Sequence, residues 1–135
     1  EEIWAHKDYT SLCASVLSQE IAIKIMEKKT RGQVLSRSSE MLKNNLKLFQ
    51  SWLDSHTGLF TFVPPQAGGM AFVGYAMNIN SMELAHKLRT EQSVLIVPGD
   101  CYGMDGYLRF GIGSHADYLS QGLELVSKGI KFIGC

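Results

Sequence analysis

The chain has 135 residues, which is enough for one domain or for part of a larger protein. Hydrophobic residues make up 45% of it and charged residues 19%, a composition that is typical of a globular interior and excludes a disordered chain. Lysine plus arginine and aspartate plus glutamate number 13 each, so the formal net charge is zero and the sequence predicts no nucleic-acid partner and no membrane partner.

The first third of the chain is predicted to be helical. Residues 9–29 contain no glycine or proline and carry apolar residues at helical spacing on two faces, so we expect one helix that needs cover from two directions. Residues 30–32 are expected to break this helix. A second helix is predicted for residues 33–54. Its apolar stripe consists of Leu42, Leu46, Phe49 and Leu53.

The remaining chain has the pattern of short strands. They are predicted at residues 59–63, 70–75, 94–97 and 107–112. The run at 94–97 is apolar throughout, which indicates a strand covered on both faces.

Two further helices are predicted among these strands. Asn80 or Ser81 caps a short helix that runs towards Glu91, and Ser114 with Asp117 has the spacing of a capping box for a final helix. The complete order is helix, helix, strand, strand, helix, strand, strand, helix. This order predicts an α/β fold of the α+β kind, with a short mixed or antiparallel sheet of about four strands packed with helices.

Arg109 is the most unusual residue in its setting, because it lies inside an apolar strand. Alternation in the strand 107–112 puts Arg109 and Gly111 on one face and the large aliphatic and phenylalanine side chains on the other. A guanidinium in such a place needs a partner, and its planar fork suits a carboxylate. That carboxylate belongs either to a ligand or to Asp100, Asp105 or another acid in a structural ion pair.

Other candidate residues carry weaker signals. Residues 111–114 open the final helix and could hold an anion, although a plain turn and helix cap explains them better. The glycines of the loop 99–106 allow close backbone approach to a ligand, and turn geometry explains them equally well. The histidines lack metal spacing and a nucleophile partner, and the clustered serines lack the context of a nucleophile elbow. These residues are His6, His56, His86, His115, Ser36, Ser38 and Ser39.

The three cysteines, Cys13, Cys101 and Cys135, lie far apart and show neither zinc-ligand spacing nor a disulfide framework. They indicate a reducing compartment. No apolar run approaches the roughly 20 residues of a membrane helix, and the N-terminus has no secretory signal. We therefore expect a cytoplasmic protein without a metal site. Glu1 is not an initiator methionine, which indicates processing or truncation.

Three segments of the last third occur in a recognisable order: Val97-Pro98-Gly99, Tyr102-Gly103 and Gly106-Tyr107-Leu108-Arg109-Phe110. Together they resemble the C-terminal signature of the class I/II aminotransferases, the pyridoxal 5′-phosphate (PLP) enzymes of fold type I. Upstream, Pro65 to Phe72 resembles the proline, paired-glycine and aromatic strand of that family. Arg37 to Trp52 resembles the helix that bridges its two domains. The resemblance extends from about Tyr9 to Phe132.

The resemblance implies a function for Arg109. In that family the arginine of the Tyr-Leu-Arg strand binds the α-carboxylate of the substrate, and this role falls on Arg109. The family's reaction exchanges an amino group between an amino acid and a 2-oxo acid, with PLP as cofactor and a homodimeric parent enzyme. The identity of the amino acid is not indicated by the residues of this chain.

The resemblance also implies that part of the active site lies elsewhere. The family's PLP lysine occurs in a Ser-x-x-Lys segment, and no lysine of this chain has that context. Residues 1–31 are then a helical remnant of the large PLP-binding domain. Residues 32–135 are the small domain, including the bridging helix 33–54. We expect such a chain to contain no catalytic base and no cofactor-binding residue, and to be unable to transaminate by itself.

Two alternatives remain open at this point. One is a stand-alone, non-catalytic module of the same fold that binds carboxylates or interacts with another protein. The other lies within the resembled family, where related enzymes run PLP-dependent C–S lyase or elimination chemistry.

Overall fold

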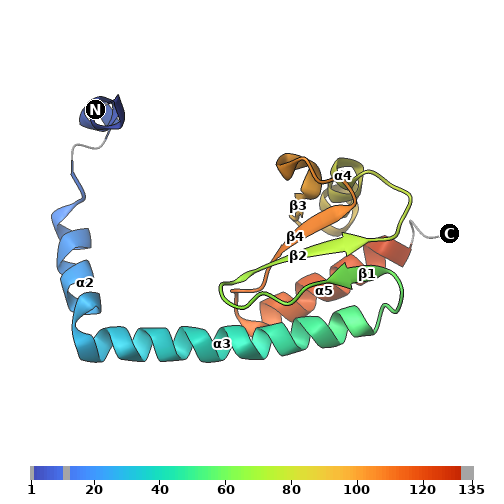
Figure 1. Cartoon of the computed structure of the whole chain (residues 1–135), viewed down its shortest axis with the longest axis horizontal. Coiled ribbons are helices and arrows are strands. Elements are labelled where there is room, and N and C mark those ends of the chain that lie inside the picture. Colours follow the sequence, from blue (N-terminus) through green and yellow to red (C-terminus); the bar gives the residue numbers. More distant parts are fainter. Residues whose placement is uncertain (1, 11–12, 132–135) are drawn as a thin grey trace. The chain divides into compact units, whose positions relative to one another are not determined.

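The computed structural model describes residues 2–10 and 13–131 (Figure 1). These residues form two compact units, within 1–39 and 40–135. The division between the units falls inside one long helix, so each unit is described separately.

The first unit is helical, but its helices begin and end at other places than the sequence predicts. Helix α1 spans Glu2–Thr10, α2 spans Val16–Met26, and α3 starts at Lys28 and continues to Asp54. The expected single helix over 9–29 is therefore wrong, because Ser15 caps a new helix by accepting a hydrogen bond from the Ser18 backbone N–H at 3.2 Å.

The expected break at residues 30–32 is also wrong. The chain leaves helical geometry at Glu27, whose ψ is 133°, and Gly32 lies inside α3. A glycine within a helix costs only about 1 kcal/mol relative to alanine, and the good helix formers around it outweigh that cost.

The second unit contains a four-stranded antiparallel sheet. Its strands are β1 (Phe60–Phe62), β2 (Met70–Tyr75), β3 (Val97–Pro98) and β4 (Tyr107–Gly111), in the order β1-β2-β4-β3. All three pairings are antiparallel. Three helices pack with this sheet: the C-terminal half of α3, α4 (Ser81–Gln92) and α5 (Ala116–Lys131). The predicted fold class is confirmed.

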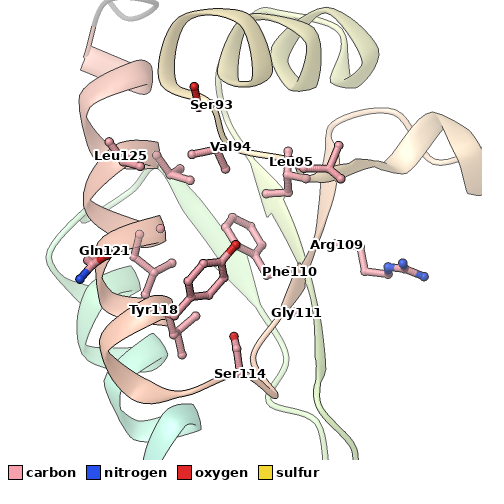
Figure 2. Close-up of a pocket in the computed structure, with 15 residues that line it drawn as sticks. Ser93, Val94, Leu95, Arg109, Phe110, Gly111, Ser114, Tyr118, Gln121 and Leu125 are labelled. Carbon is pink, nitrogen blue, oxygen red and sulfur yellow. The ribbon is translucent and has the colours of Figure 1, made fainter.

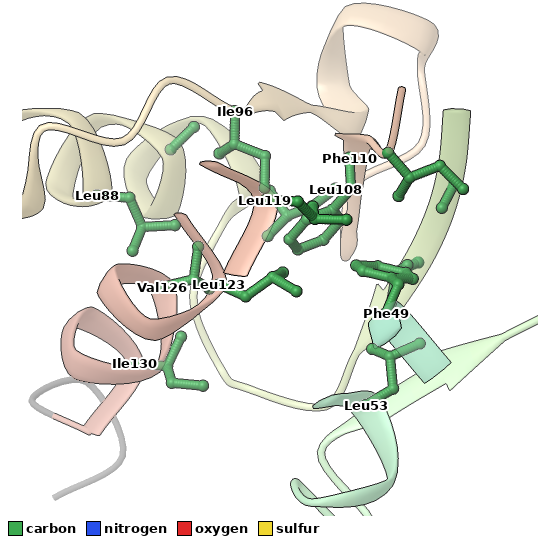
Figure 3. Packing of buried hydrophobic residues seen from close by; sticks show 14 of the residues in the cluster. Phe49, Leu53, Leu88, Ile96, Leu108, Phe110, Leu119, Leu123, Val126 and Ile130 are labelled. Carbon is green, nitrogen blue, oxygen red and sulfur yellow. The ribbon is translucent and has the colours of Figure 1, made fainter. Parts of the chain in front are cut away.

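The core lies between one face of the sheet and these helices (Figure 3). Alternate residues of β2 and β4 contribute to it, together with the apolar stripes of the three helices. The core side chains that are at most 5% exposed are Phe49, Ala71, Val73, Leu84, Leu88, Leu108, Phe110, Ile112, Leu123, Val126 and Ile130. The opposite face of the sheet carries a different set of residues, and Arg109 is one of them.

The predicted strand at 94–97 is mostly wrong. Only Val97 belongs to a strand there, and Leu95 is 86% exposed rather than covered on both faces. The reason is the end of α4, where Ser93 adopts a left-handed conformation with φ 56° and the Val94 N–H bonds back to the Leu88 carbonyl at 3.1 Å. This helix cap uses the backbone that a longer strand would need.

The two predicted helix caps differ in outcome. Asn80 caps α4 as expected, since its side-chain oxygen accepts from the Met82 N–H at 2.9 Å. Helix α5 begins at Ala116, one residue later than a capping box on Ser114 requires, and that prediction is wrong. The Ser114 carbonyl instead accepts a hydrogen bond from the buried side chain of Asn45 in α3, at 2.7 Å.

Candidate functional site

Arg109 lies on the face of the sheet that is turned away from the helices. Its neighbours Leu108 and Phe110 are buried in the core, so the predicted alternation of this strand is confirmed. In the sheet register Arg109 is paired with Phe72 of β2 on one side and with Val97 of β3 on the other. These two neighbours flank the arginine side chain, which is half-buried.

Three aromatic side chains, Phe72, Tyr102 and Tyr107, surround Arg109 on this face, and we call them the aromatic trio. Tyr107 stacks on Phe72, with ring centroids 5.0 Å apart and an angle of 10° between the planes. Tyr102 meets Phe72 edge to face, with centroids 6.0 Å apart. The arginine therefore lies beside a connected aromatic surface.

Tyr102 makes two contacts with Arg109. The guanidinium carbon lies 5.6 Å from the centroid of the Tyr102 ring, within the range of a cation–π interaction. The Nη1 group of Arg109 also donates a hydrogen bond to the Tyr102 hydroxyl oxygen. The ring and the hydroxyl therefore act on the same guanidinium.

The loop between β3 and β4 sets the position of Tyr102. The loop begins with a 3₁₀ turn, η1 (Gly99–Tyr102). Two backbone hydrogen bonds of 3.0 Å close this turn: the Gly103 N–H donates to the Asp100 carbonyl, and the Met104 N–H donates to the Gly99 carbonyl. A Cβ at Gly99 would collide with the Met104 carbonyl oxygen, so only glycine fits there. Gly103 has a φ of 68°, the left-handed region that favours glycine. Turn geometry therefore accounts for both glycines.

The acids of this loop are bound to helix α4 and not to Arg109. Asp105 Oδ1 accepts from the Ser81 and Gly106 N–H groups, each at 2.7 Å. Asp100 Oδ2 accepts from the Asn80 side-chain amide at 2.7 Å. The Ser81 N–H, followed by the Gly106 N–H, holds the pKa of Asp105 below its usual value of 3.8.

These contacts decide one question that the sequence leaves open. Among the described residues of the second unit, 40–131, no carboxylate lies within 4.0 Å of the Arg109 guanidinium. The structural ion pair with Asp100 or Asp105 is therefore not formed. Arg109 keeps nitrogen atoms other than Nη1 available for a planar, two-pronged contact with a carboxylate.

A hollow of about 310 Å³ lies beside β4, and Arg109 is one of the residues that line it. It is bounded by α5 and by residues 93–96, and its lining includes Phe110 and Tyr118 (Figure 2). Figure 2 shows the Arg109 side chain pointing away from Tyr118. Arg109 thus lines this hollow, but its guanidinium end points away from Tyr118 of α5.

The histidines do not form a site with Arg109. His6, His86 and His115 are exposed, and His115 lies 3.5 Å from the Asp117 carboxylate. His56 is half-buried, with Nδ1 2.9 Å from the Trp52 carbonyl oxygen and Nε2 near Ser127. Among the described residues, no group of three or more histidine, cysteine, aspartate or glutamate side chains is arranged to hold a metal ion.

The remaining sequence candidates also lie apart from Arg109. The clustered serines are in α3 and contribute to no described hollow. Of residues 111–114, Gly111 ends β4 and the other three lie in the link to α5, where the Ile112 N–H bonds to the Gly69 carbonyl at 2.8 Å. Cys13 and Cys101 are free and exposed, and Cys135 lies outside the described residues.

All nine lysines of the chain lie in helices. Eight of them are exposed, and the half-buried Lys87 forms an ion pair with Glu83 at 2.9 Å. None of them lines the hollow beside α5 or the two hollows beside β1. No described helix is long and apolar enough to cross a membrane.

Sequence reasoning identified Arg109 but missed Tyr102 as its partner. Periodicity reports which residues share a strand face, and Tyr102 reaches that face from a turn. The pair of glycines at 99 and 103 was the available signal, because it indicates a turn tight enough to fold Tyr102 back over the strand.

Comparison with known proteins gives a consistent result. The family model "Aminotransferase class I and II" matches residues 5–124. Capreomycidine synthase from Streptomyces vinaceus is 25% identical over 122 residues, which cover 90% of this chain and 31% of that enzyme. The crystal structure of a PLP-dependent aminotransferase from Streptococcus suis superposes with a TM-score of 0.85 at 27% identity, over 96% of this chain and 34% of that one. A PLP-dependent cyclase has the same fold, with a TM-score of 0.80 at 21% identity over 96% of this chain and 35% of its own. The chain thus spans about a third of the length of these relatives.

Proposed function

Because the chain belongs to the class I and II aminotransferases, we propose that it is the small-domain part of a PLP-dependent aminotransferase and that Arg109 binds the substrate α-carboxylate. The observation that carries this proposal is the guanidinium itself. It lies on an open sheet face, is held by Tyr102, and has no acid of residues 40–131 within ion-pair distance.

The proposed role of Arg109 is to orient the substrate. Two parallel N–H···O bonds fix both oxygens of a carboxylate and hence the direction of the bonds at the substrate Cα. Such positioning lowers the barrier of the following step more than binding strength alone would. The parent would exchange an amino group between an amino acid and a 2-oxo acid, and PLP would supply the electron sink when bound.

The residues of this chain do not fit PLP on their own. A PLP enzyme requires a lysine beside a phosphate-binding cradle, whereas the lysines of this chain lie in helices and line neither the hollow beside α5 nor the two hollows beside β1. We therefore place the PLP lysine in another part of the parent and derive no cofactor step from this chain. The isolated chain is expected to be inactive in transamination.

The proposed domain assignment follows from the same idea. Residues 1–31 would be a helical remnant of the large domain, and residues 32–135 the small domain. Helix α2 supports this assignment, because none of its residues is buried although its apolar residues lie on several sides. A surface of that kind is normally covered by another part of a protein. A homodimeric parent stays a prediction.

A second candidate function concerns the reaction type. Two relatives are a capreomycidine synthase and a PLP-dependent cyclase, so the parent could run a cyclisation instead of a transamination. Assaying the parent with an amino acid and a 2-oxo acid separates them, since only a transaminase consumes the 2-oxo acid.

Borohydride trapping tests whether this chain forms its own covalent bond to PLP. The purified chain is incubated with PLP, reduced, and mapped by mass spectrometry, with the urea-unfolded chain as the control for non-specific labelling. We expect the same scattered, low labelling of exposed lysines in both samples. One adduct per folded chain on a single lysine would contradict the proposal that the PLP lysine lies elsewhere.

A further inference from the structure

We infer that Tyr102 is a positioning residue for Arg109 and determines how well the site binds a carboxylate. The inference rests on the proposed function of Arg109 and deepens it. It is carried by contacts within the second unit of the structure, between η1, β2 and β4.

The first step is that one tyrosine makes two contacts with the guanidinium. The guanidinium carbon lies 5.6 Å from the centroid of the Tyr102 ring, within the range of a cation–π attraction. The hydroxyl oxygen accepts the Nη1 hydrogen bond in the guanidinium plane. A long arginine side chain has several rotatable bonds, and these two contacts together select one arrangement of its end group.

The second step is that Tyr102 is itself fixed. Its ring meets Phe72 edge to face, and Phe72 is held in turn by the stacked Tyr107. Its backbone lies in η1, which is tied to the start of α4 by the hydrogen bond from the Asp100 N–H to the Ser81 hydroxyl, at 3.0 Å. The restraint on Arg109 is therefore connected to the core of the unit.

The third step is that the same loop keeps its own carboxylates from pairing with Arg109, where they would compete with a substrate carboxylate. Asp100 and Asp105 lie on either side of Tyr102 in the sequence, yet their carboxylates are bonded to Asn80 and Ser81. The loop thus brings an aromatic hydroxyl to Arg109 and keeps its carboxylates away. Nitrogen atoms of Arg109 other than Nη1 stay available for the carboxylate of an amino acid or a 2-oxo acid.

A double-mutant cycle in the PLP-loaded parent tests this inference. The variants are Tyr102→Phe, Arg109→Lys and the double variant, with Tyr118→Phe on the exposed side of α5 as the matched tyrosine control. Tyr102→Phe keeps the ring and removes only the hydroxyl. It should raise KM for the amino acid roughly three- to tenfold and change kcat less than about twofold. In the Arg109→Lys background the same change should have no further effect on KM.

The outcomes separate the inference from the proposed function. If Arg109→Lys lowers kcat/KM but Tyr102→Phe behaves like Tyr118→Phe, the positioning role is wrong and the proposed function stands. If Arg109→Lys changes nothing, the proposed function is wrong and the inference falls with it. Equal effects of Tyr102→Phe in both backgrounds would indicate a merely structural role and would also overturn the inference.

A second measurement does not depend on activity. In the 135-residue chain labelled with ¹⁵N-arginine, the Arg109 guanidinium should rotate more slowly than that of exposed Arg89, and Tyr102→Phe should reduce the difference, because it removes the hydroxyl and keeps the ring. Equal rotation rates in the unmodified chain would contradict the restraint by Tyr102.

Discussion

Asn45, in the middle of α3, donates a hydrogen bond of 2.8 Å from its side-chain amide to the backbone carbonyl of Ile112, which follows β4. The same amide donates to the Ser114 carbonyl at 2.7 Å, and Asn45 is only 1% exposed. A buried amide thus satisfies two carbonyl groups of the link from β4 to α5, where the strand ladder has ended. This contact anchors the strand that carries Arg109 to the long helix.

Replacing Asn45 with alanine should destabilise the second unit strongly. The change removes two hydrogen bonds and leaves two carbonyl groups without these partners, for a loss of about 2–4 kcal/mol in the free energy of unfolding. Urea unfolding followed by circular dichroism measures this loss. Asn44→Ala, on the exposed side of the same turn, should stay within about 0.5 kcal/mol of the unmodified chain. Similar values for the two variants would show that the Asn45 bonds contribute nothing.

Gly99→Ala should disrupt the loop that presents Tyr102. The added Cβ would collide with the Met104 carbonyl and lie 2.8 Å from the Tyr107 carbonyl oxygen, and both are backbone atoms that cannot turn away. We expect a loss of roughly 2 kcal/mol or more in unfolding free energy. Gly122→Ala has open space in α5 and should instead stabilise the chain, by up to about 1 kcal/mol. Thermal unfolding of both variants measures these changes. A Gly99→Ala variant that is as stable as the unmodified chain would contradict the described turn.

Arg109→Lys should weaken the proposed carboxylate contact without unfolding the chain. Lysine keeps the positive charge but lacks the planar fork, so kcat/KM of the parent should fall by at least about tenfold. The matched control is Arg89→Lys, at an exposed position of α4, which should leave kcat/KM unchanged. An equal kcat/KM for the two lysine variants would refute the carboxylate role.

The decrease in folding stability at low pH should depend on Asp105. Its pKa is lowered in the folded chain, chiefly by the Ser81 N–H, so its stabilising effect is fully present above the usual value of 3.8. That effect is lost as the pH falls below 3.8 and through the lower pKa of the folded state. Asp105→Asn should therefore reduce stability at pH 6 and flatten the decline towards pH 2. Urea titrations at several pH values measure this, with exposed Glu124→Gln of α5 as the control. Parallel pH curves for Asp105→Asn and the unmodified chain would contradict the prediction.

Local patterns predicted much of this structure. The alternation around Arg109 placed Leu108 and Phe110 in the core, and the Asn80 side chain identified the start of α4, because both features depend on only a few neighbouring residues. The errors arose where two local tendencies compete. Gly32 did not end a helix that strong helix formers surround, and the helix cap at Ser93 shortened an otherwise convincing strand.

The candidate site was predictable only in part. Arg109 stood out because a charge interrupts an apolar strand, and the ordered motifs of the family gave it a role. The positions of Asp100 and Asp105 could not be read from the sequence, because both acids are close enough in the chain to pair with the arginine. Their actual partners, Asn80 and Ser81, depend on how α4 packs beside the loop.

Both outer strands of the sheet are short and lie next to proline. Strand β3 has two residues and includes Pro98, whereas β1 has three and is followed, after Val63, by Pro64 and Pro65. Proline has no N–H to offer to an incoming strand, and so short an edge gives another chain little to pair with. These edges should hinder strand-to-strand aggregation while the domain folds, so replacing Pro98 is expected to promote fibril formation.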